Sequence, residues 1–139
     1  MDTQISTLMT TPVITVRADD TVTAVAEVLA RHGISFVPVT ERAGGTALGI
    51  ISSGDILHFK NCGDDTDEPK AWQICAYKPL TVPPEASIAH VARLMVEHQA
   101  HHVLVMRGPE LVGVVSSLDF VKHYITHAED AARMAAGKE

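Results

Sequence analysis

The sequence predicts a mixed α/β (α+β) protein built from two pseudo-symmetric β-α-β-β-α units that pack sheet to sheet. Three observations predict this: a repeat covering nearly all of the 139 residues, a helical spacing of apolar residues in each copy, and a segment that occurs as "GIISSGDI" (49–56) and as "GVVSSLDF" (113–120). Self-similarity at a fixed spacing indicates a repeated structural unit. One copy of about 60 residues buries too little surface to be stable alone, so two copies are expected to share a core.

Each copy begins with a short strand and a helix. The helix is expected to start at Asp20 or Thr21 in the first copy and at Ser87 in the second, because these side chains accept hydrogen bonds from first-turn N–H groups. Gly33 is typical of the residue that follows a helix in the left-handed conformation. Apolar residues recur at helical spacing after both starts: Val22, Val25, Ala26 and Leu29, then Ile88, Val91, Ala92 and Met95.

A hairpin and a second helix complete each copy. Apolar runs at 36–39 and 47–52, and at 102–106 and 111–116, predict the hairpin strands, with turns at Gly44-Gly45 and Gly108-Pro109. The second helix is expected to begin near Asp55 or Asp119, and in the second copy it can continue to about residue 136.

These elements give the domain boundaries. The first unit is predicted at 1–60, a linker at 61–73, the second unit at 74–126 and a helical tail at 127–139. The linker is expected to hold a short helix around Trp72 and Ile74, with Asp67 as a possible cap and Pro69 in its first turn.

The composition excludes several classes of function. A net charge of −6 argues against a nucleic-acid partner, which would require a basic face. No apolar run approaches the roughly 18–20 residues that span a bilayer, and the N-terminus lacks a secretion-type pattern, so we expect a cytoplasmic protein without a membrane partner. Cys62 and Cys75 form no CxxC pair and are expected to be free thiols.

The repeated segment allows two interpretations, which are compatible. A serine three residues before an aspartate at a helix start is a common capping arrangement. The same hydroxyl, carboxylate and helix N-terminus can also hold a ribose phosphate. The sequence shows no nucleophile–base pair, catalytic metal set or cofactor fingerprint, so we do not expect an enzyme.

The repeat resembles a tandem pair of CBS domains, also called a Bateman module, from about Ile5 to Tyr124. The family's unit opens with "MTxxPxTV", continues to a "hxhhPV" strand and ends with "hxGhhTxxDh". The first copy matches at Met9-Thr10, Thr15-Val16, Val37-Pro38-Val39, Gly49-Ile50-Ile51-Ser52 and Asp55. The second copy matches at Pro79, Thr81-Val82, Val103-Leu104-Val105, Gly113-Val114-Val115-Ser116 and Asp119.

The resemblance implies a regulatory module that binds adenosine-containing ligands (AMP, ADP, ATP or S-adenosylmethionine) in clefts between the units, with no required cofactor. It implies a homodimer through the helices after Asp55 and Asp119, and an effector protein that the sequence does not identify. The ribose and phosphate residues would be Ser52, Ser53, Asp55, Ser116, Ser117 and Asp119. The adenine pockets would be lined by Val13, Ile14, Thr15, Ser35, Phe36, Val37 and Pro38, and by Pro79, Leu80, Thr81, His101, His102, Val103 and Leu104.

The chain departs from the family pattern at three points. Cys75-Ala76 replaces the second Met-Thr pair, Leu104 replaces the second proline, and no Arg or Lys stands just before either second strand. The two pockets are therefore expected to be unequal, and a monophosphate, a diphosphate or S-adenosylmethionine fits them better than a triphosphate. The alternative is a ligand-free interaction or dimerisation module, since Phe36 is large enough to occlude a cleft.

The histidine-rich stretch "EHQAHH" (97–102) invites a metal interpretation, which we do not favour. Successive strand residues point to opposite faces, so His101 and His102 cannot both join His98. We expect no metal site. We expect His101 or His102 to face a ligand phosphate, which predicts weaker binding of an anion at about pH 8 than at about pH 6.

Overall fold

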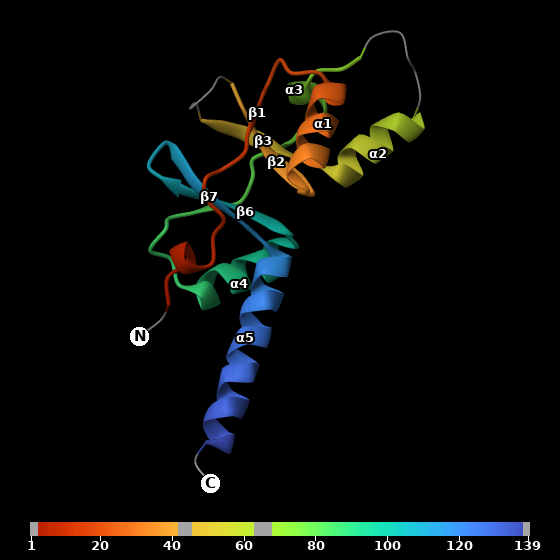
Figure 1. Ribbon diagram of the computed structural model, residues 1–139. Helices are drawn as coiled ribbons and strands as arrows, with labels where there is room; N and C mark the ends of the chain where they lie inside the picture. Colours follow the sequence, from red (N-terminus) through yellow and green to blue (C-terminus); the bar gives the residue numbers. More distant parts are fainter. Residues whose placement is uncertain (1–2, 42–45, 63–67, 138–139) are drawn as a thin grey trace.

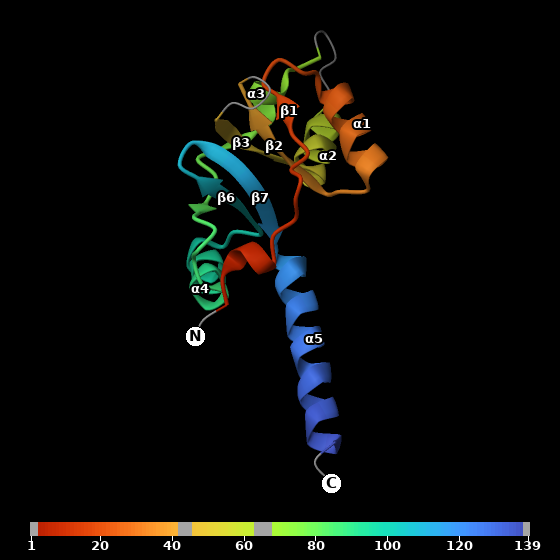
Figure 2. The ribbon, with the colours of Figure 1, turned by 60° about the vertical axis from the view of Figure 1, so that its left-hand side comes forward.

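Two similar units make up the molecule, which is described by a computed structural model over residues 3–41, 46–62 and 68–137. Figures 1 and 2 show the helices of each unit on the outer side of its sheet, and a long C-terminal helix that projects away from both units. The first sheet has the strand order β1-β2-β3-β4 and the second has β5-β6-β7. The predicted fold class is confirmed.

The first unit keeps the predicted order of elements. It consists of η1 (Ile5–Thr7), β1 (Val16–Arg17), α1 (Val22–His32), β2 (Phe36–Thr40), β3 (Ala47–Ser52) and α2 (Ser53–Cys62). β1 pairs parallel with β2, and β2 pairs antiparallel with β3. The predicted turn at Gly44-Gly45, the cap at Asp67 and the side chain of Cys62 lie outside the described residues.

The second unit repeats this order. It is preceded by α3 (Ala71–Ile74) and β4 (Ala76–Tyr77), and continues as β5 (Thr81–Val82), α4 (Ile88–His98), β6 (His102–Arg107), β7 (Glu110–Ser116) and α5 (Ser117–Ala136). β5 pairs parallel with β6, which pairs antiparallel with β7. The long final helix and the short linker helix are confirmed. Lys70 is the N-cap of α3, so the prediction that Pro69 lies in its first turn is wrong.

Local side chains set the ends of α1 and α4. The Thr21 hydroxyl accepts a bond from the Ala24 N–H (3.2 Å), and the Ser87 hydroxyl accepts one from the His90 N–H (3.1 Å). α1 ends at Gly33, which has a φ of 62°. α4 ends in the same conformation at Gln99, a residue that tolerates it less readily than glycine.

The segment before each unit packs on the other unit. β4 pairs with β3 of the first sheet, while Thr10 forms a bridge with Val114 in the second sheet. The cores follow the same exchange: Ile5 is buried in the core of the second unit, and Ala71 is buried in the core of the first. This exchange ties the units together and places residues from both units at each end of their interface.

The exchange explains the glycine that opens the repeated segment. A Cβ on Gly49 would overlap the carbonyl oxygen of Ala76 in β4. A Cβ on Gly113, at the equivalent place, would overlap the Met9 side chain. Glycine is therefore needed in both copies because the crossing segment lies directly on the strand.

We expect Gly49→Ala to destabilise the protein by about 1–3 kcal/mol, because the added methyl group meets backbone atoms that cannot turn away. Gly113→Ala should cost less, since the Met9 side chain can change rotamer. Gly54→Ala in α2 is the control, because its Cβ meets only the Ser52 hydroxyl at 3.6 Å and alanine favours a helix. Urea unfolding measures all three changes; equal stability of Gly49→Ala and Gly54→Ala would contradict the close approach.

A small apolar core joins the two sheets. Phe36 and Ile50 of the first unit and Leu104 of the second are buried together, with Val114 and Met106 packed against them. The Phe36 ring also stacks on the His102 ring, with centroids 4.0 Å apart and an interplanar angle of 29°. The predicted sheet-to-sheet packing therefore includes one aromatic contact between the units.

This position changes the protonation of His102. Burial lowers the pKa of His102 from 6.5, His101 acts in the same direction, and Asp55 opposes the change. The neutral ring is the form that the folded state favours.

Acid should therefore weaken the contact between the units. Since the folded pKa of His102 is lowered, its contribution to stability is complete above the unfolded value and is lost as the pH falls through the folded value. We expect the unfolding free energy to fall more between about pH 7.5 and about pH 5.5 for the parent than for His102→Phe, which keeps the stack and does not titrate. Equal losses in the two proteins, measured by urea unfolding, would contradict this.

Candidate ligand-binding clefts

Two clefts open where the units meet, and each begins at one of the repeated Ser–Asp pairs. The Asp55 cleft, about 330 Å³ in volume, includes Ser52, Asp55 and the second unit's Leu80. The Asp119 cleft, about 190 Å³ in volume, includes Ser116, Asp119 and the first unit's Phe36.

The two units contribute opposite walls to each cleft. Facing Asp55 are residues of the second unit: Ala76, Tyr77, Lys78, Pro79, Leu80, Ala100, His101 and His102. Facing Asp119 are residues of the first unit: Thr10, Pro12, Ile14, Gly33, Ile34, Ser35, Phe36 and Pro38. Each polar pair is thus combined with the apolar residues of the other copy, because the segment leading into each unit crosses to its neighbour.

The Ser–Asp pairs cap the helices that follow them. One oxygen of Asp55, Oδ2, accepts the Ser52 N–H at 2.9 Å and the Ser52 hydroxyl at 3.0 Å, while the Asp55 N–H donates to that hydroxyl at 3.2 Å. Oδ2 of Asp119 accepts the Ser116 N–H at 2.8 Å and the Ser116 hydroxyl at 3.1 Å. The capping interpretation is therefore correct for both copies.

Capping leaves part of each carboxylate available. The bonds described for Asp55 and Asp119 all use Oδ2, so within the described residues Oδ1 makes no hydrogen bond. Both carboxylates are partly exposed and line their clefts. A carboxylate oxygen in this position can accept hydroxyl groups of a bound sugar.

The second serine of each motif does not line its cleft. The Ser53 N–H donates to the Ser35 carbonyl at 2.8 Å, and the Ser117 N–H donates to the His101 carbonyl at 2.9 Å. The first N–H of each helix is therefore not available to an anion. Ser53 is exposed outside the Asp55 cleft, and Ser117 lines a separate groove between α4 and α5.

The structure separates the predicted adenine-pocket residues into three groups. Eight of them line a cleft: Ile14, Ser35, Phe36, Pro38, Pro79, Leu80, His101 and His102. Val13, Thr15 and Thr81 lie off both cleft walls.

The third group consists of three buried side chains that line neither cleft. Val37 and Val103 are fully buried in the cores of their own units, and Leu104 is fully buried between the sheets. Strand alternation explains the two valines, because their neighbours Phe36 and His102 take the face toward the other unit.

Two lysines that were not predicted from the sequence line the clefts. Lys78 lies in the Asp55 cleft, where its backbone has a φ of 56°, and Lys122 lies in the Asp119 cleft. The sequence-based expectation of basic residues covered only the positions just before the second strands. Lys122 follows Asp119 by three residues on α5, a helical spacing that places both on one face and was a usable signal.

The structure brings the two adjacent histidines of the "EHQAHH" stretch to one cleft. His101 and His102 both line the Asp55 cleft, so they do not separate to opposite faces there. The lowered pKa of His102 makes its ring a poor partner for a phosphate near neutral pH.

The described residues contain neither a metal-binding cluster nor a membrane-spanning helix. Across 3–41, 46–62 and 68–137, no three His, Cys, Asp or Glu residues converge in a way that could hold a metal ion. In the same part of the chain, no helix has the length and apolar character needed to cross a bilayer.

Two curated relatives come from Methanocaldococcus jannaschii. The uncharacterized protein MJ0188 is 32% identical over 127 residues, which is 90% of this chain and 45% of that protein. The uncharacterized protein MJ1404 is 30% identical over 135 residues, which is 88% of this chain and 32% of that protein. The chain therefore spans less than half the length of either relative.

Solved structures share the fold. The CBS domain pair of protein MJ0100, in complex with 5′-methylthioadenosine and S-adenosyl-L-methionine, has a TM-score of 0.81 and 23% identity, covering 91% of this chain and 99% of that one. CBSX2 in complex with AMP has a TM-score of 0.76 and 19% identity, covering 90% and 98%.

The family comparison covers both units. The CBS domain matches residues 5–61 and again residues 71–126, so each match holds one Ser–Asp pair and one set of cleft-wall residues. The chain therefore belongs to the CBS domain family and carries two of these domains in tandem.

Proposed function

We propose that this protein is a regulatory module that senses an adenosine-containing ligand, either an adenine nucleotide or S-adenosylmethionine, and passes its occupancy to a partner protein. One observation carries the proposal: each cleft brings together a helix-start carboxylate, a lysine and an apolar wall from the opposite unit. The binding of 5′-methylthioadenosine, S-adenosylmethionine and AMP by structural neighbours supports it.

The three parts of each cleft suit the three parts of a nucleotide. The aspartate accepts the ribose hydroxyls, as acidic residues do in dinucleotide sites. Lys78 or Lys122 balances the charge of a phosphate. The apolar wall, with Leu80 in one cleft and Ile14 in the other, packs against the adenine ring. One lysine in each cleft favours a monophosphate or S-adenosylmethionine over ATP.

The clefts should differ in affinity. The Asp55 cleft, at about 330 Å³, falls within the usual range of ligand pockets, whereas the Asp119 cleft, at about 190 Å³, falls below it. Phe36 and Pro12 contribute to the wall of the smaller cleft. We expect the Asp55 cleft to fill first, at lower ligand concentration.

The position of the clefts suits a sensor. A ligand in either cleft contacts both units, so it stabilises the relative arrangement of the units that fits it. Binding shifts such an equilibrium only by the difference in affinity for the two arrangements. The alternative function is an interaction module that binds no ligand. The small volume of the Asp119 cleft favours an absence of ligand at that cleft.

Asp55→Asn and Asp119→Asn should each weaken one binding event. The amide oxygen of asparagine can still accept the capping bond, while the charge that holds the ribose is lost. We expect affinity for that cleft to fall about tenfold or more, as for hydrogen bonds to charged groups. Calorimetry with AMP and with S-adenosylmethionine measures this, with the exposed Asp19→Asn as control.

The calorimetry also decides between the two functions. If the parent shows neither heat nor a melting shift with millimolar ligand, the interaction module is the correct function. If the parent binds and both aspartate variants bind as it does, the assignment of the site is wrong.

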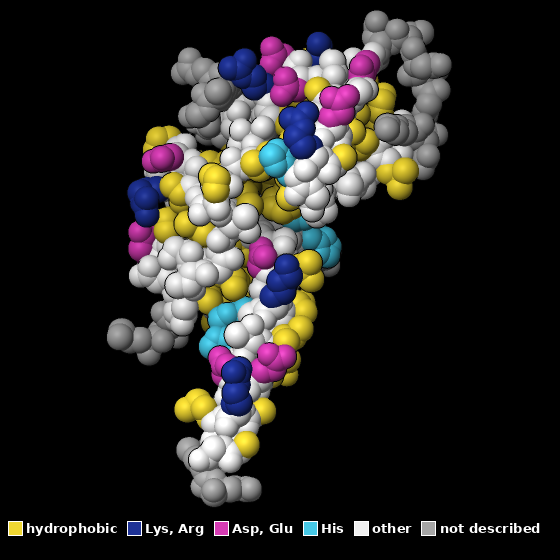
Figure 3. Space-filling model, viewed as in Figure 1, with side chains coloured by type: hydrophobic (Ala, Val, Ile, Leu, Met, Phe, Trp, Pro, Cys, Tyr) yellow, Lys and Arg dark blue, Asp and Glu magenta, His cyan; other side chains and the backbone are white. Residues whose placement is uncertain are grey.

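We also propose that the protein forms a homodimer, with α4 and α5 at the interface rather than the α2 and α5 helices that the resemblance implied. An apolar groove of about 460 Å³ lies between these helices, with Met95, Val96 and Phe120 in its lining. Beside it, α5 exposes a stripe that includes Val121, Tyr124 and Ile125, and Figure 3 shows hydrophobic side chains along one side of this helix. A second copy related by a twofold axis can place its stripe against this groove, which covers both apolar surfaces at once.

A charge on the apolar stripe should separate the dimer. Tyr124, 73% exposed, lies on the stripe, and Thr126 lies on the opposite, polar side of α5. We expect Tyr124→Glu to convert the dimer to a monomer, because a carboxylate would be buried without a partner. Thr126→Glu should leave it dimeric. Sedimentation equilibrium measures the mass; a monomeric parent, or a dimeric Tyr124→Glu protein, would contradict the proposal.

A further inference from the structure

We propose that His123 and His127 on α5 form a chelating site for a divalent transition metal such as Zn²⁺, separate from both clefts. The two imidazole rings contact each other in a tilted arrangement, with their centroids 4.1 Å apart and an interplanar angle of 56°. They are four residues apart, so they lie on one face of the helix, one turn above the other. Within the described residues, neither imidazole has a hydrogen-bond partner.

The chemistry of the pair suits a metal. Two histidines at this spacing on one helix can direct one nitrogen each toward a single ion, as they do in helical zinc sites. Neutral imidazole nitrogen is a preferred ligand of Zn²⁺, Ni²⁺ and Cu²⁺, whereas Mg²⁺ prefers oxygen. No covalent change is involved: the ion replaces water ligands with two nitrogens.

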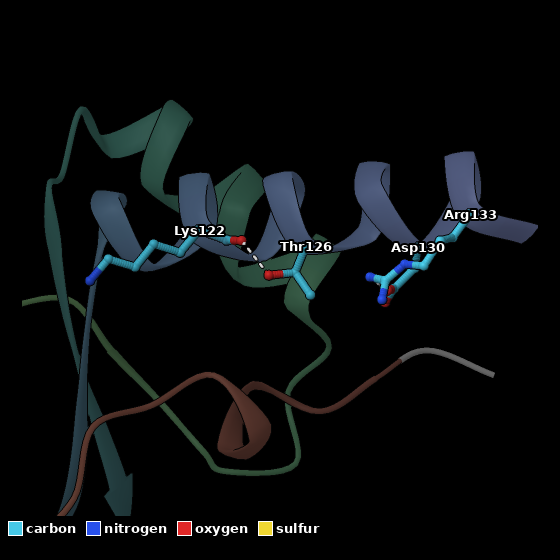
Figure 4. A network of polar contacts seen from close by, with 4 residues as sticks. All are labelled: Lys122, Thr126, Asp130 and Arg133. Atoms are coloured by element: carbon cyan, nitrogen blue, oxygen red, sulfur yellow. Dashed lines mark hydrogen bonds and ion pairs between the residues drawn. The ribbon is translucent and has the colours of Figure 1, made fainter.

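The rest of the helix defines the site's limits. Figure 4 shows the neighbouring polar side: the Thr126 hydroxyl donates to the Lys122 carbonyl at 3.0 Å, and Arg133 pairs with Asp130 at 2.8 Å. Asp130, the acidic residue one turn beyond His127, is thus already engaged by Arg133. The pair supplies two ligands, and the remaining positions belong to water or to the same pair of a second chain.

The position of the pair indicates what the ion would do. His123 is half-buried, whereas His127 and the other described side chains of α5 from Tyr124 to residue 137 are exposed. Figure 1 shows that α5 projects from the body of the protein. A metal that joins the two residues clamps one turn of a helix that has little tertiary packing to stabilise it. Bound metal should therefore stabilise the projecting part of α5.

Zn²⁺ titration of the full chain, followed by competition with a chromophoric indicator, tests the proposal. We expect His123→Ala and His127→Ala each to lower Zn²⁺ affinity by at least about tenfold. Loss of a residue that only hydrogen-bonds to a metal ligand already costs about tenfold, and here the ligand itself is removed. His90→Ala is the matched control, because this exposed histidine on α4 has no histidine one turn away, and it should bind as the parent does. Mg²⁺ should not compete.

Amide hydrogen exchange supplies a second measurement that does not depend on the indicator. Zn²⁺ should slow exchange in the turn between residues 123 and 127 in the parent and not in His127→Ala. A stoichiometry of one ion per chain and a stoichiometry of one ion per two chains both support the chelate. In the second case, the two histidines of another copy supply the remaining ligands. If the parent binds no Zn²⁺ at about 100 μM, a concentration far above the dissociation constants of protein zinc sites, the proposal is overturned. Unchanged affinity in both histidine variants would overturn it as well.

Discussion

The packing of the two sheets against each other is the constraint on which the rest of the structure depends. Phe36, Ile50 and Leu104 form a buried core between the units, and each unit also receives the segment that leads into the other. A unit of about 60 residues buries too little surface to be stable alone, so this shared burial is part of the stability of each half. It also means that neither cleft is complete in an isolated unit.

The same packing makes the clefts neighbours. The Phe36 ring lines the Asp119 cleft, the His102 ring lines the Asp55 cleft, and the two rings stack on each other. A ligand that moves either ring therefore acts on a wall of the other cleft through a single contact. Because burial lowers the pKa of His102, acid acts on this contact as well. A ligand in either cleft, a proton on His102 and the arrangement of the units would thus all act through one contact, as the proposed sensing function requires.

Local patterns predicted most of the fold, and non-local contacts explain what they missed. The repeat, the apolar spacing and the caps at Thr21 and Ser87 depend on neighbouring residues, and all were confirmed. The crossing segments were missed because β4 has two residues and Thr10 forms a single bridge, which leaves no periodic pattern. The Ser–Asp pairs were identified, but the wall that faces each depends on that crossing. The position of Lys78 in the cleft could not be predicted from neighbouring residues. Its backbone is left-handed, a conformation that is rare for lysine and that no local pattern indicates.

Two-site calorimetry of Lys78→Ala with AMP tests the central claim, that each cleft is built from both units. Lys78 belongs to the second unit and lies in the cleft of the first unit's Asp55. We expect Lys78→Ala to weaken the same binding event as Asp55→Asn and to leave intact the event that Asp119→Asn weakens. If Lys78→Ala instead weakens the event assigned to Asp119, each unit forms its own site and the crossed arrangement is wrong.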